Sequence, residues 1–447
     1  MTQRIQGRWL FWMLVAVLFA SAPMMAKRKP RRDGRPNRRI SAERNGNVAT
    51  RPGLRLRLMT DLGNVRIRTK DAGQVEYRVR LEADADDPNA KQLLDQFTVS
   101  AHGGSDGVTL RGQIPGSDLN GQIWVTWEVT VPTDYSIEAS TQAGNLDIGD
   151  VRGRLALSTE GGNISAGNVA GSARLDTKGG HITVGDVSSE LTAETAGGHV
   201  TAGQVGGRAV LHTGGGHIHV TSVREVARLE TGGGNISVEH SGGELIVETG
   251  GGQIMVGEAA GAIHARTGGG GIRVAKVAGA TELETGAGGI YLTQVGNAVR
   301  ASTGAGRITA WFGPDLKLEK PCELESGQGD IDVYLPRQFP VTIDATIRLG
   351  DEHRFISDPA FPLKVVYENS GGGVHTVRAE GPLNGGGPVL RLRTVAGNIR
   401  LILCDATQLL QQRQLQKQQM ESLQQQLRVL QQKNKEMEKD QKEDDPE

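Results

Sequence analysis

A threonine recurs every 18 residues through the middle of the chain, and this spacing constrains the fold more than any other feature. A glycine lies three residues after each of these threonines, and an aliphatic residue lies five residues after each. The threonines are Thr141, Thr159, Thr177, Thr195, Thr213, Thr231, Thr249, Thr267, Thr285 and Thr303. Self-similarity at a fixed short period is the signature of a repeat protein whose units contact mainly their neighbours.

Each repeat contains two short segments in which apolar and polar residues alternate. In one unit Leu155, Leu157 and Thr159 alternate with polar residues, two glycines follow, and Ile164 and Ala166 continue the alternation. Such alternation bounded by glycine turns is typical of half-buried β-strands. Two strands cannot bury an apolar face alone, but units stacked in register can. We therefore predict an all-β fold, a single-stranded β-solenoid (β-helix) of 18-residue rungs without an internal ligand cavity.

Weaker copies of the repeat begin near Leu56, Cys322 and Leu390. They extend the array beyond its regular part, and we expect the irregular segments around them to cap both ends. Caps are needed because an open solenoid end exposes an unpaired sheet edge. No helix is expected between about 50 and 400, since no segment there has a 3.6-residue period. The predicted regions are an N-terminal β cap with the first rung over 51–140, regular rungs over 141–313, and C-terminal β rungs with a cap over 314–404.

The composition fits many repeated turns and excludes several protein classes. Glycine accounts for 63 of the 447 residues, against a usual share of about 7%. With only 16 prolines, the chain fits neither collagen nor a proline-rich disordered protein. Two cysteines cannot build a disulfide framework or a cysteine zinc site, so we expect Cys322 and Cys404 to be buried free thiols. The net charge of -1 gives no general attraction for nucleic acid, and no nucleic-acid partner is expected.

The first 26 residues resemble an export signal. Trp9–Ala22 is an uncharged apolar run preceded by two arginines, as in a signal peptide. The segment 27–50 begins with a basic run and is predicted to be a disordered linker, with binding to acidic lipid or polymer as the alternative. Basic residues after an apolar run also favour a retained anchor, and 9–26 is just long enough to span a membrane. We expect export to the cell envelope, in the periplasm or at the cell surface, with residues 1–26 as a signal peptide or as an uncleaved membrane anchor.

After Cys404 the composition changes abruptly to Gln, Lys, Glu and Leu. The region 405–447 is predicted to be a helix with a charged, disordered end. Apolar residues at heptad spacing indicate about two heptads of coiled coil; they are Leu409, Met420, Leu423, Leu427, Leu430 and Met437. Homo-oligomerisation through 405–440 or docking to another helix is the hypothesis, and a solitary or partly disordered helix is the alternative.

Charged residues form columns on the expected outer face of the rod. The acidic column consists of Asp176, Glu194, Glu230, Glu248 and Glu284, and a basic column two positions earlier in the repeat consists of Arg174, Arg228, His264 and Arg300. Matched charges on an outer face usually form a solvated surface in which each pair contributes little. A polymer-binding strip and a catalytic acid pair are the alternatives. Because ten rungs run without the loop insertions that usually shape a catalytic groove, no catalytic residue is assigned.

Three further patterns have a structural and a chemical interpretation. His181, His199 and His217 occupy one slot on successive rungs, flanked by Asn163 and Asn235. Stacked imidazoles are able to bind zinc or copper, but no fourth ligand is evident, so we interpret them as a turn ladder with no metal and no cofactor. The repeat threonines are expected to bond the glycine turns, with an outward ice-binding ladder as the alternative. The glycine-rich turns lack the helix and the Lys-Ser/Thr pair of a phosphate loop.

Three segments carry a family resemblance: VTVPTDYSIEASTQAGNLDIGDVRG (129–153), the repeated T-x-G-G-x-I-x-(A/V), and LESGQGDIDVYLP (324–336). With these segments the chain resembles a bacterial family of candidate adhesins known as DUF4097, over roughly residues 40–404. The resemblance implies the β-strand-repeat fold and a role in cell-surface binding. It implies no catalytic residues, and the C-terminal region lies outside it.

The sequence as a whole favours a non-catalytic β-solenoid of the cell envelope. Its expected role is that of an adhesin or surface scaffold that binds a glycan or a protein. A carbohydrate-active enzyme on a β-helix is the first alternative, and the absence of tryptophan between 128 and 310 disfavours an aromatic-lined sugar groove. A membrane-anchored cytoplasmic scaffold is the second alternative.

Overall fold

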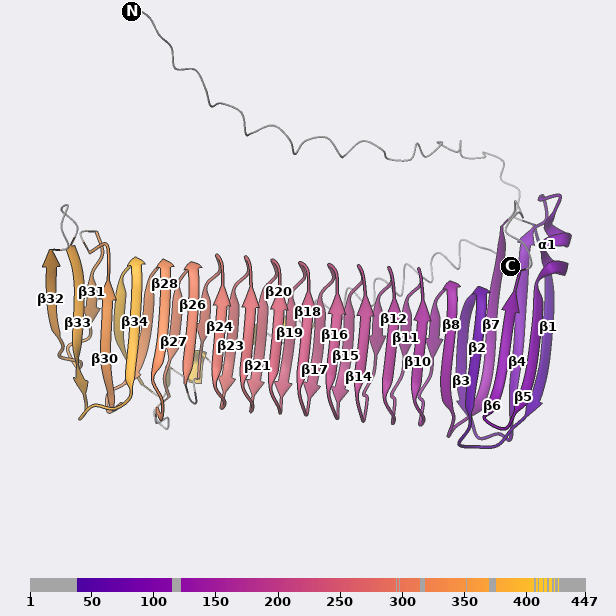
Figure 1. The fold of residues 1–447 in the computed structure, drawn as a ribbon, viewed down its shortest axis with the longest axis horizontal. Coiled ribbons are helices and arrows are strands. Elements are labelled where there is room, and N and C mark those ends of the chain that lie inside the picture. Colours follow the sequence, from indigo (N-terminus) through magenta and orange to yellow (C-terminus); the bar gives the residue numbers. More distant parts are fainter. Residues whose placement is uncertain are drawn as a thin grey trace, which may run out of the picture.

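The two alternating segments of each repeat form two parallel-paired β-strands, and the rungs stack into a straight rod (Figure 1). The computed structural model describes residues 38–425, except for 115–121, 295, 297, 314–317, 351, 370–374, 406, 409, 413, 416–417, 420–421 and 423–424. The predicted signal segment 1–26 therefore lies outside the described residues. The strands form two long sheets, here sheet A and sheet B, whose inner faces enclose one continuous apolar core.

Each regular rung contributes one strand to each sheet. The strands of sheet B are β8 (Ser136–Ala143), β10 (Leu155–Thr159), β12 (Ala173–Thr177), β14 (Leu191–Thr195), β16 (Ala209–Thr213), β18 (Ala227–Thr231), β20 (Leu245–Thr249), β22 (Ile263–Thr267), β24 (Thr281–Thr285) and β26 (Val299–Ala305). Those of sheet A are β9 (Leu146–Ile148), β11 (Ile164–Ala166), β13 (Ile182–Val184), β15 (Val200–Val205), β17 (Ile218–Val223), β19 (Ile236–Ser241), β21 (Ile254–Ala259), β23 (Ile272–Val277), β25 (Ile290–Leu292) and β27 (Ile308–Trp311).

The register follows the 18-residue period. Thr159 pairs with Thr141 on one side and Thr177 on the other, and Ile164 pairs with Ile182 in sheet A. Like residues therefore stack on like residues, so one buried position becomes a buried column along the rod. Leu157 is 2% exposed, and the equivalent residues of neighbouring rungs are equally buried. The predicted β-solenoid is confirmed.

The weaker copies of the repeat are also rungs. At the N-terminal end β2 (Arg55–Leu62) pairs with β8 and β3 (Asn64–Lys70) pairs with β9, so that Thr60 lies beside Thr141. At the other end β28 (Cys322–Gln328) and β29 (Ile331–Pro336) continue the stack, followed by β34 (Val389–Ala396) and β35 (Ile399–Cys404). Ser326 takes the threonine position, with Thr303 on one side and Thr394 on the other.

Antiparallel strands and a short helix close the N-terminal end. The strands are β1 (Arg39–Ala49), β4 (Gln74–Asp84), β5 (Thr98–Gly104), β6 (Gly107–Gln113) and β7 (Ile123–Pro132), and the helix is α1 (Ala90–Gln96). β6 and β7 pair with the first rung, while β5 and β4 pair outside them and β1 pairs with β4.

Two expectations about this end are wrong. Residues 39–49, placed in the disordered linker 27–50, form β1, because antiparallel pairing with β4 lets Ile40 and Val48 pack against the core. The described residues also include a helix between 50 and 400, α1. With seven residues it is too short to show a helical period, yet it buries Leu93 and Leu94 over β4.

The C-terminal end closes differently. A parallel strand β30 (Val341–Ile347) extends sheet B beyond β34, and the antiparallel strands β33 (His375–Leu383) and β32 (Lys364–Asn369) follow outside it. Sheet A ends at a three-residue strand, β31 (Phe355–Ser357), which pairs with β35. β32 is the outermost strand of sheet B at this end of the rod (Figure 1).

The described residues between Thr407 and Gln425 are helical, as predicted for the start of the C-terminal region. The heptad residues Leu409, Met420, Leu423, Leu427, Leu430 and Met437 lie outside the described residues, so the coiled coil stays a prediction. Within the part of the chain that the structure describes, no helix has the length and apolar character needed to cross a membrane.

Candidate functional site

The repeat threonines are buried at the edge of the core and hold the glycine turns. The Thr213 hydroxyl donates a hydrogen bond to the Gly198 carbonyl at 2.8 Å and accepts one from the Gly216 amide at 3.1 Å. The same pair of bonds recurs at Thr159, Thr177, Thr195, Thr231, Thr249, Thr267 and Thr285. The structural interpretation is confirmed, and the outward ice-binding ladder is wrong because Thr213 is 0% exposed.

A second ladder runs along the glycine turns, four residues after each repeat threonine. In each step a backbone amide donates to the side chain of the preceding rung, over 2.8 to 2.9 Å. The side chains that accept are Asn64, Asn145, Asn163, His181, His199, His217 and Asn235. Asn and His serve equally because each presents an acceptor, Oδ1 or Nδ1, at the same reach.

The three histidines of this ladder stack ring on ring. Ring centroids are 4.9 Å apart for His181 and His199 and 4.8 Å apart for His199 and His217. Each Nδ1 accepts a hydrogen bond from a backbone amide, so the lone pair of Nδ1 faces the backbone and Nε2 is the nitrogen left to carry a proton. Burial lowers the pKa of His199, and the two neighbouring imidazoles add to this effect.

This geometry favours the turn-ladder interpretation over a metal site. A histidine ligand binds a metal through a free lone pair, and the Nδ1 lone pair of each ring is already engaged by backbone. Among the described residues, no group of three or more His, Cys, Asp or Glu side chains has an arrangement that would hold a metal ion.

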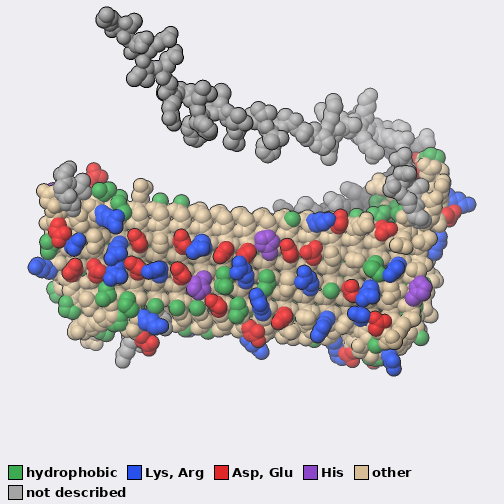
Figure 2. Space-filling view, in the orientation of Figure 1, with side chains coloured by type: hydrophobic (Ala, Val, Ile, Leu, Met, Phe, Trp, Pro, Cys, Tyr) green, Lys and Arg blue, Asp and Glu red, His purple; other side chains and the backbone are tan. Residues whose placement is uncertain are grey.

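The charged columns lie on the outer face of sheet B, and their pairing is partial. Arg228 pairs with Glu230, Arg266 with Glu284 at 2.9 Å, His264 with Glu282 at 3.2 Å and Arg300 with Glu323 at 3.0 Å. Figure 2 shows charged side chains of both signs interspersed over one face of the rod. Within the described chain, Asp176, Glu194 and Glu248 have no ion pair. The predicted solvated, paired surface therefore accounts for only part of the acidic column.

The unpaired Glu248 lies in a groove along the corner between sheet B and the glycine turns. The groove has a volume of about 930 Å³ and is open to solvent. Three repeat positions line it on successive rungs: the acidic or basic residue, the threonine, and the first glycine of the turn. Glu230, Glu248, Arg266 and Glu284 supply the charged side chains in its central part. The columns in the sequence predicted that these charged side chains share one face, but they did not predict the groove. The groove forms because the turn glycines have no side chains to fill this corner.

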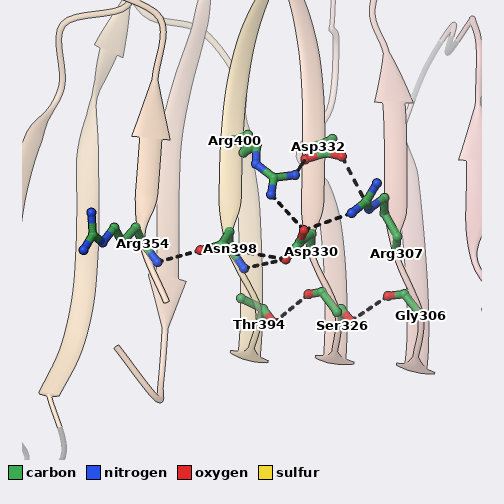
Figure 3. A network of polar contacts seen from close by, with 10 residues as sticks. Gly306, Arg307, Ser326, Asp330, Asp332, Arg354, Thr394, Asn398 and Arg400 are labelled. Carbon is green, nitrogen blue, oxygen red and sulfur yellow. Dashed lines mark hydrogen bonds and ion pairs between the residues drawn. The ribbon is translucent and has the colours of Figure 1, made fainter. Parts of the chain in front are cut away.

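A cross-rung polar network joins the last regular rung to the C-terminal rungs (Figure 3). The Arg400 guanidinium donates to Asp332 at 2.9 Å and to Asp330 at 3.0 Å, and Arg307 reaches Asp330 from the other side at 3.1 Å. Asp330 also accepts the Asn398 amide at 2.9 Å. Burial opposes charge on Asp330, but these donors outweigh it and lower the pKa of its carboxyl. Asp330 and Asn398 occupy the ladder slot, so the network continues the turn ladder past an irregular segment.

The sequence columns did not reveal an aromatic strip on the outer face of sheet A. Trp311 and Tyr334 stack with centroids 3.6 Å apart and rings 2° from parallel, and Trp311 is 5% exposed. Beside them the Tyr291 hydroxyl donates to Gln412 Oε1 at 2.8 Å. The start of the C-terminal helical segment therefore contacts the rod of its own chain. The aromatics stand at outward positions of three different strands, a signal that only the register makes visible.

Both cysteines are buried free thiols, as expected. Burial raises the pKa of Cys322 and raises that of Cys404 to about 11. Because the thiolate is the reactive form, both are inert near neutral pH.

Comparisons with known proteins bear on the fold. The family model described as Toastrack DUF4097 matches residues 55–274. No curated protein matches the sequence.

Three solved structures are among those similar to the chain. The first, named for cell adhesion in Clostridium sporogenes, is 8% identical over 82% of this chain and 100% of its own, with a TM-score of 0.18. The second, named as a candidate adhesin from Bacteroides fragilis, is 13% identical over 67% and 99%, with a TM-score of 0.21.

The third, named for lipid binding in Parabacteroides distasonis, is 10% identical over 65% and 96%, with a TM-score of 0.18. At such TM-scores none of the three says anything about function. The family match spans the first rung and most of the regular rungs described above. Through the rungs between residues 55 and 274, the chain matches the Toastrack DUF4097 family.

Proposed function

We propose that the protein is a non-catalytic, adhesin-like binding module of the cell envelope, and that its groove along sheet B holds an extended polymer. The observation that carries the proposal is the continuity of this groove. The same three repeat positions line it on successive rungs from Glu230 to Ser302. A chain lying along the rod would meet an equivalent set of groups about every 4.8 Å.

The chemistry of the groove favours a polymer rich in hydroxyl and amino groups. Its walls carry carboxylates that accept hydrogen bonds, and Glu248 has no ion pair among the described residues that would compete. The turn glycines leave backbone within reach of the ligand. A linear amino-sugar glycan offers hydroxyl and amino donors at a regular spacing. Its amines would also pair with Glu248 and the neighbouring carboxylates.

The enzyme alternative has less support. Glycoside hydrolysis needs two carboxyl groups on opposite sides of a scissile bond, whereas the groove acids lie in one column. Glu230 and Glu284 are each paired with an arginine of the same chain. Release of reducing ends from a bound glycan would reverse this preference.

A charge reversal in the groove tests the proposal. We expect Glu248→Arg to weaken binding of a linear amino-sugar polymer at least tenfold, measured by calorimetry on the full chain. The matched control is Glu258→Arg, the same charge change on the exposed face of sheet A, which should leave binding unchanged. Polylysine and the fully N-acetylated glycan are the comparison ligands. Equal loss in both variants, or binding of none of these polymers, would contradict the groove assignment.

We also propose export to the cell envelope, supported by the apolar run in residues 1–26. Protease added to intact cells or spheroplasts should then cleave the protein. Full protection until the inner membrane is broken would instead favour the anchored cytoplasmic scaffold.

A further inference from the structure

The exposed large apolar side chains of the described chain all lie beyond residue 348. Six belong to the C-terminal end of the rod: Leu349, Ile356, Val365, Val366, Tyr367 and Val395. The other two, Leu410 and Leu415, belong to the helical segment. Neither the regular rungs nor the N-terminal cap exposes any within the part described. Since soluble proteins seldom gather such side chains at one place without a partner, the C-terminal end is the part of the rod most suited to a contact.

Half of the six C-terminal residues belong to β32, the last strand of sheet B. All six residues of this strand are exposed, and among the described strands it pairs only with β33. Val365 and Tyr367 lie opposite Ala379 and Val377, which are 1% exposed. The two β32 residues therefore share the core-facing side of sheet B. They remain exposed, Tyr367 by 62%, because sheet A ends with β31 and does not cover them.

The N-terminal edge is built in another way. Its outermost strand in sheet A, β1, alternates between half-buried and exposed residues, and α1 packs beside it. The outward residues of β1 include Arg39 and Glu43, and charges along an edge strand discourage further pairing. β32 has one lysine and one glutamate, at opposite ends of an apolar centre.

We propose that β32 is a self-association edge that pairs antiparallel with β32 of a second copy about a two-fold axis at Val366. This register places Lys364 opposite Glu368 of the partner, and Val365 opposite Tyr367 of the partner, twice each. Two kinds of cross-strand pair that stabilise antiparallel sheets are a pair of oppositely charged residues and an aromatic residue opposite a β-branched one. A two-fold contact uses the same patch on both copies and so closes after two chains.

The pairing has a physical benefit on each face of the strand. On the core-facing side, Val365 and Tyr367 of the two copies cover each other where sheet A leaves them open. On the outer side, the Lys364 ammonium gains a carboxylate, while Glu368 keeps its ion pair with Arg378 at 3.3 Å. Sheet B then runs continuously from one rod into the other. The residues of this surface are not those of the predicted coiled coil or of the groove along sheet B, so the proposal stands independently of both.

Register-specific crosslinking tests the proposal on the full chain. Val366→Cys puts a thiol on the two-fold axis, directly opposite its copy, at a spacing that suits a disulfide. The matched control Val365→Cys faces Tyr367 of the partner, so its own copy lies about 7–8 Å away on the diagonal. With oxidised glutathione as the oxidant, we expect Val366→Cys to give at least ten times more covalent dimer on a non-reducing gel. The buried native thiols stay inert.

At low protein concentration, where the chain is monomeric, both introduced cysteines should react equally with a soluble thiol reagent, which shows that the two thiols are equally exposed. If both are labelled yet crosslink equally, or neither crosslinks, the proposed edge is wrong.

A charge-swap mixture provides a second test. Lys364→Glu alone and Glu368→Lys alone each place like charges across the edge, so each should sediment as a monomer at concentrations where the wild type dimerises. Mixing the two variants places opposite charges across both pairs, and the heterodimer should form. Intact β structure by circular dichroism confirms that each variant is folded. Homodimers of either variant, or no association in the mixture, would overturn the proposal.

Discussion

The regular rungs and the terminal strand β32 are both short β-segments, yet they differ in how many of their backbone and side-chain groups have a partner on a neighbouring strand. In a regular rung a neighbour lies on both sides. Thr213 bonds one rung behind and its own turn ahead, and His199 accepts an amide from the next rung. β32 has a neighbour on one side only among the described strands, and all its residues are exposed.

The difference shows what stacking contributes. A rung is stabilised mainly by the rungs next to it, as in other quasi-one-dimensional folds, so stability falls where the stack stops. The N-terminal end meets this problem with antiparallel strands and a helix, and Trp127 is fully buried there. The C-terminal end leaves one strand uncovered. Substitutions should therefore be costly in the rungs and nearly neutral for folding at β32.

The largest effect is expected at a turn glycine of the rungs. A Cβ at Gly234 would lie 1.9 Å from the Gly216 carbonyl oxygen, whereas a Cβ at Gly233 would meet nothing within 4 Å. We expect Gly234→Ala to lower the free energy of unfolding by about 3 kcal/mol, because two backbones have to separate. Gly233→Ala should change it by less than about 0.5 kcal/mol. Urea denaturation measures both, and similar values would contradict the close stacking of the turns.

A smaller loss is expected at the threonine column. Thr213→Val keeps the shape but leaves the Gly198 carbonyl and the Gly216 amide without partners, at a cost of about 2 kcal/mol. The control is Thr192→Val, a half-buried threonine on the outer face of sheet B, which should cost less than about 0.5 kcal/mol. Equal effects in urea denaturation would mean that the buried hydroxyl contributes nothing to the turn.

The histidine ladder should make the rungs sensitive to acid. The pKa of His199 in the folded protein lies below the ordinary histidine value of 6.5, so the unfolded chain binds more protons in this range. The stabilising contribution is full above about pH 6.5 and is lost as the pH falls below it, moderated by the partial exposure of the ring. His199→Asn retains an acceptor that does not titrate, so its melting temperature should fall less between pH 7.5 and pH 5. If the melting temperatures of variant and wild type fell equally with pH, His199 would not be the cause of the acid sensitivity.

The smallest effect is expected at the terminal strand. Tyr367→Ala removes a ring that is 62% exposed, so the unfolding free energy at low protein concentration should change by less than about 0.5 kcal/mol. A loss above about 1 kcal/mol would show that the C-terminal hairpin is packed like a rung and would end the contrast between the two regions.

The features that the sequence predicted correctly are those that repeat from rung to rung. The threonine column, the Asn and His ladder and the burial of Cys322 all follow from one rung, because the register copies one local environment along the rod. The sequence failed to predict β1 and α1, each of which occurs once. The basic start of the 27–50 segment hid the alternation of residues 39–49, and two turns of helix are too short for a periodic signal.

The groove and the aromatic strip mark a second limit. The sequence identified Glu230, Glu248 and Glu284 as a column, but not that bare glycine corners hollow the surface beside them. Trp311 and Tyr334 lie at the same position of their rungs, but an irregular segment separates the two rungs in sequence, and Tyr291 lies at a different repeat position. Only the pairing of β27 with β29 brings two of them into a stack.

The amino-acid pattern alone therefore specified the rung, the direction of its side chains and the regular stack, because these depend on contacts between positions 18 residues apart. The tertiary structure decided how the stack ends, which carboxylates form an ion pair with an arginine, and which strand is left uncovered. Those outcomes depend on contacts between segments that meet only once, such as β33 with β32 or β4 with β1. A periodic signal carries no information about such contacts, since neither segment predicts the other until the chain has folded.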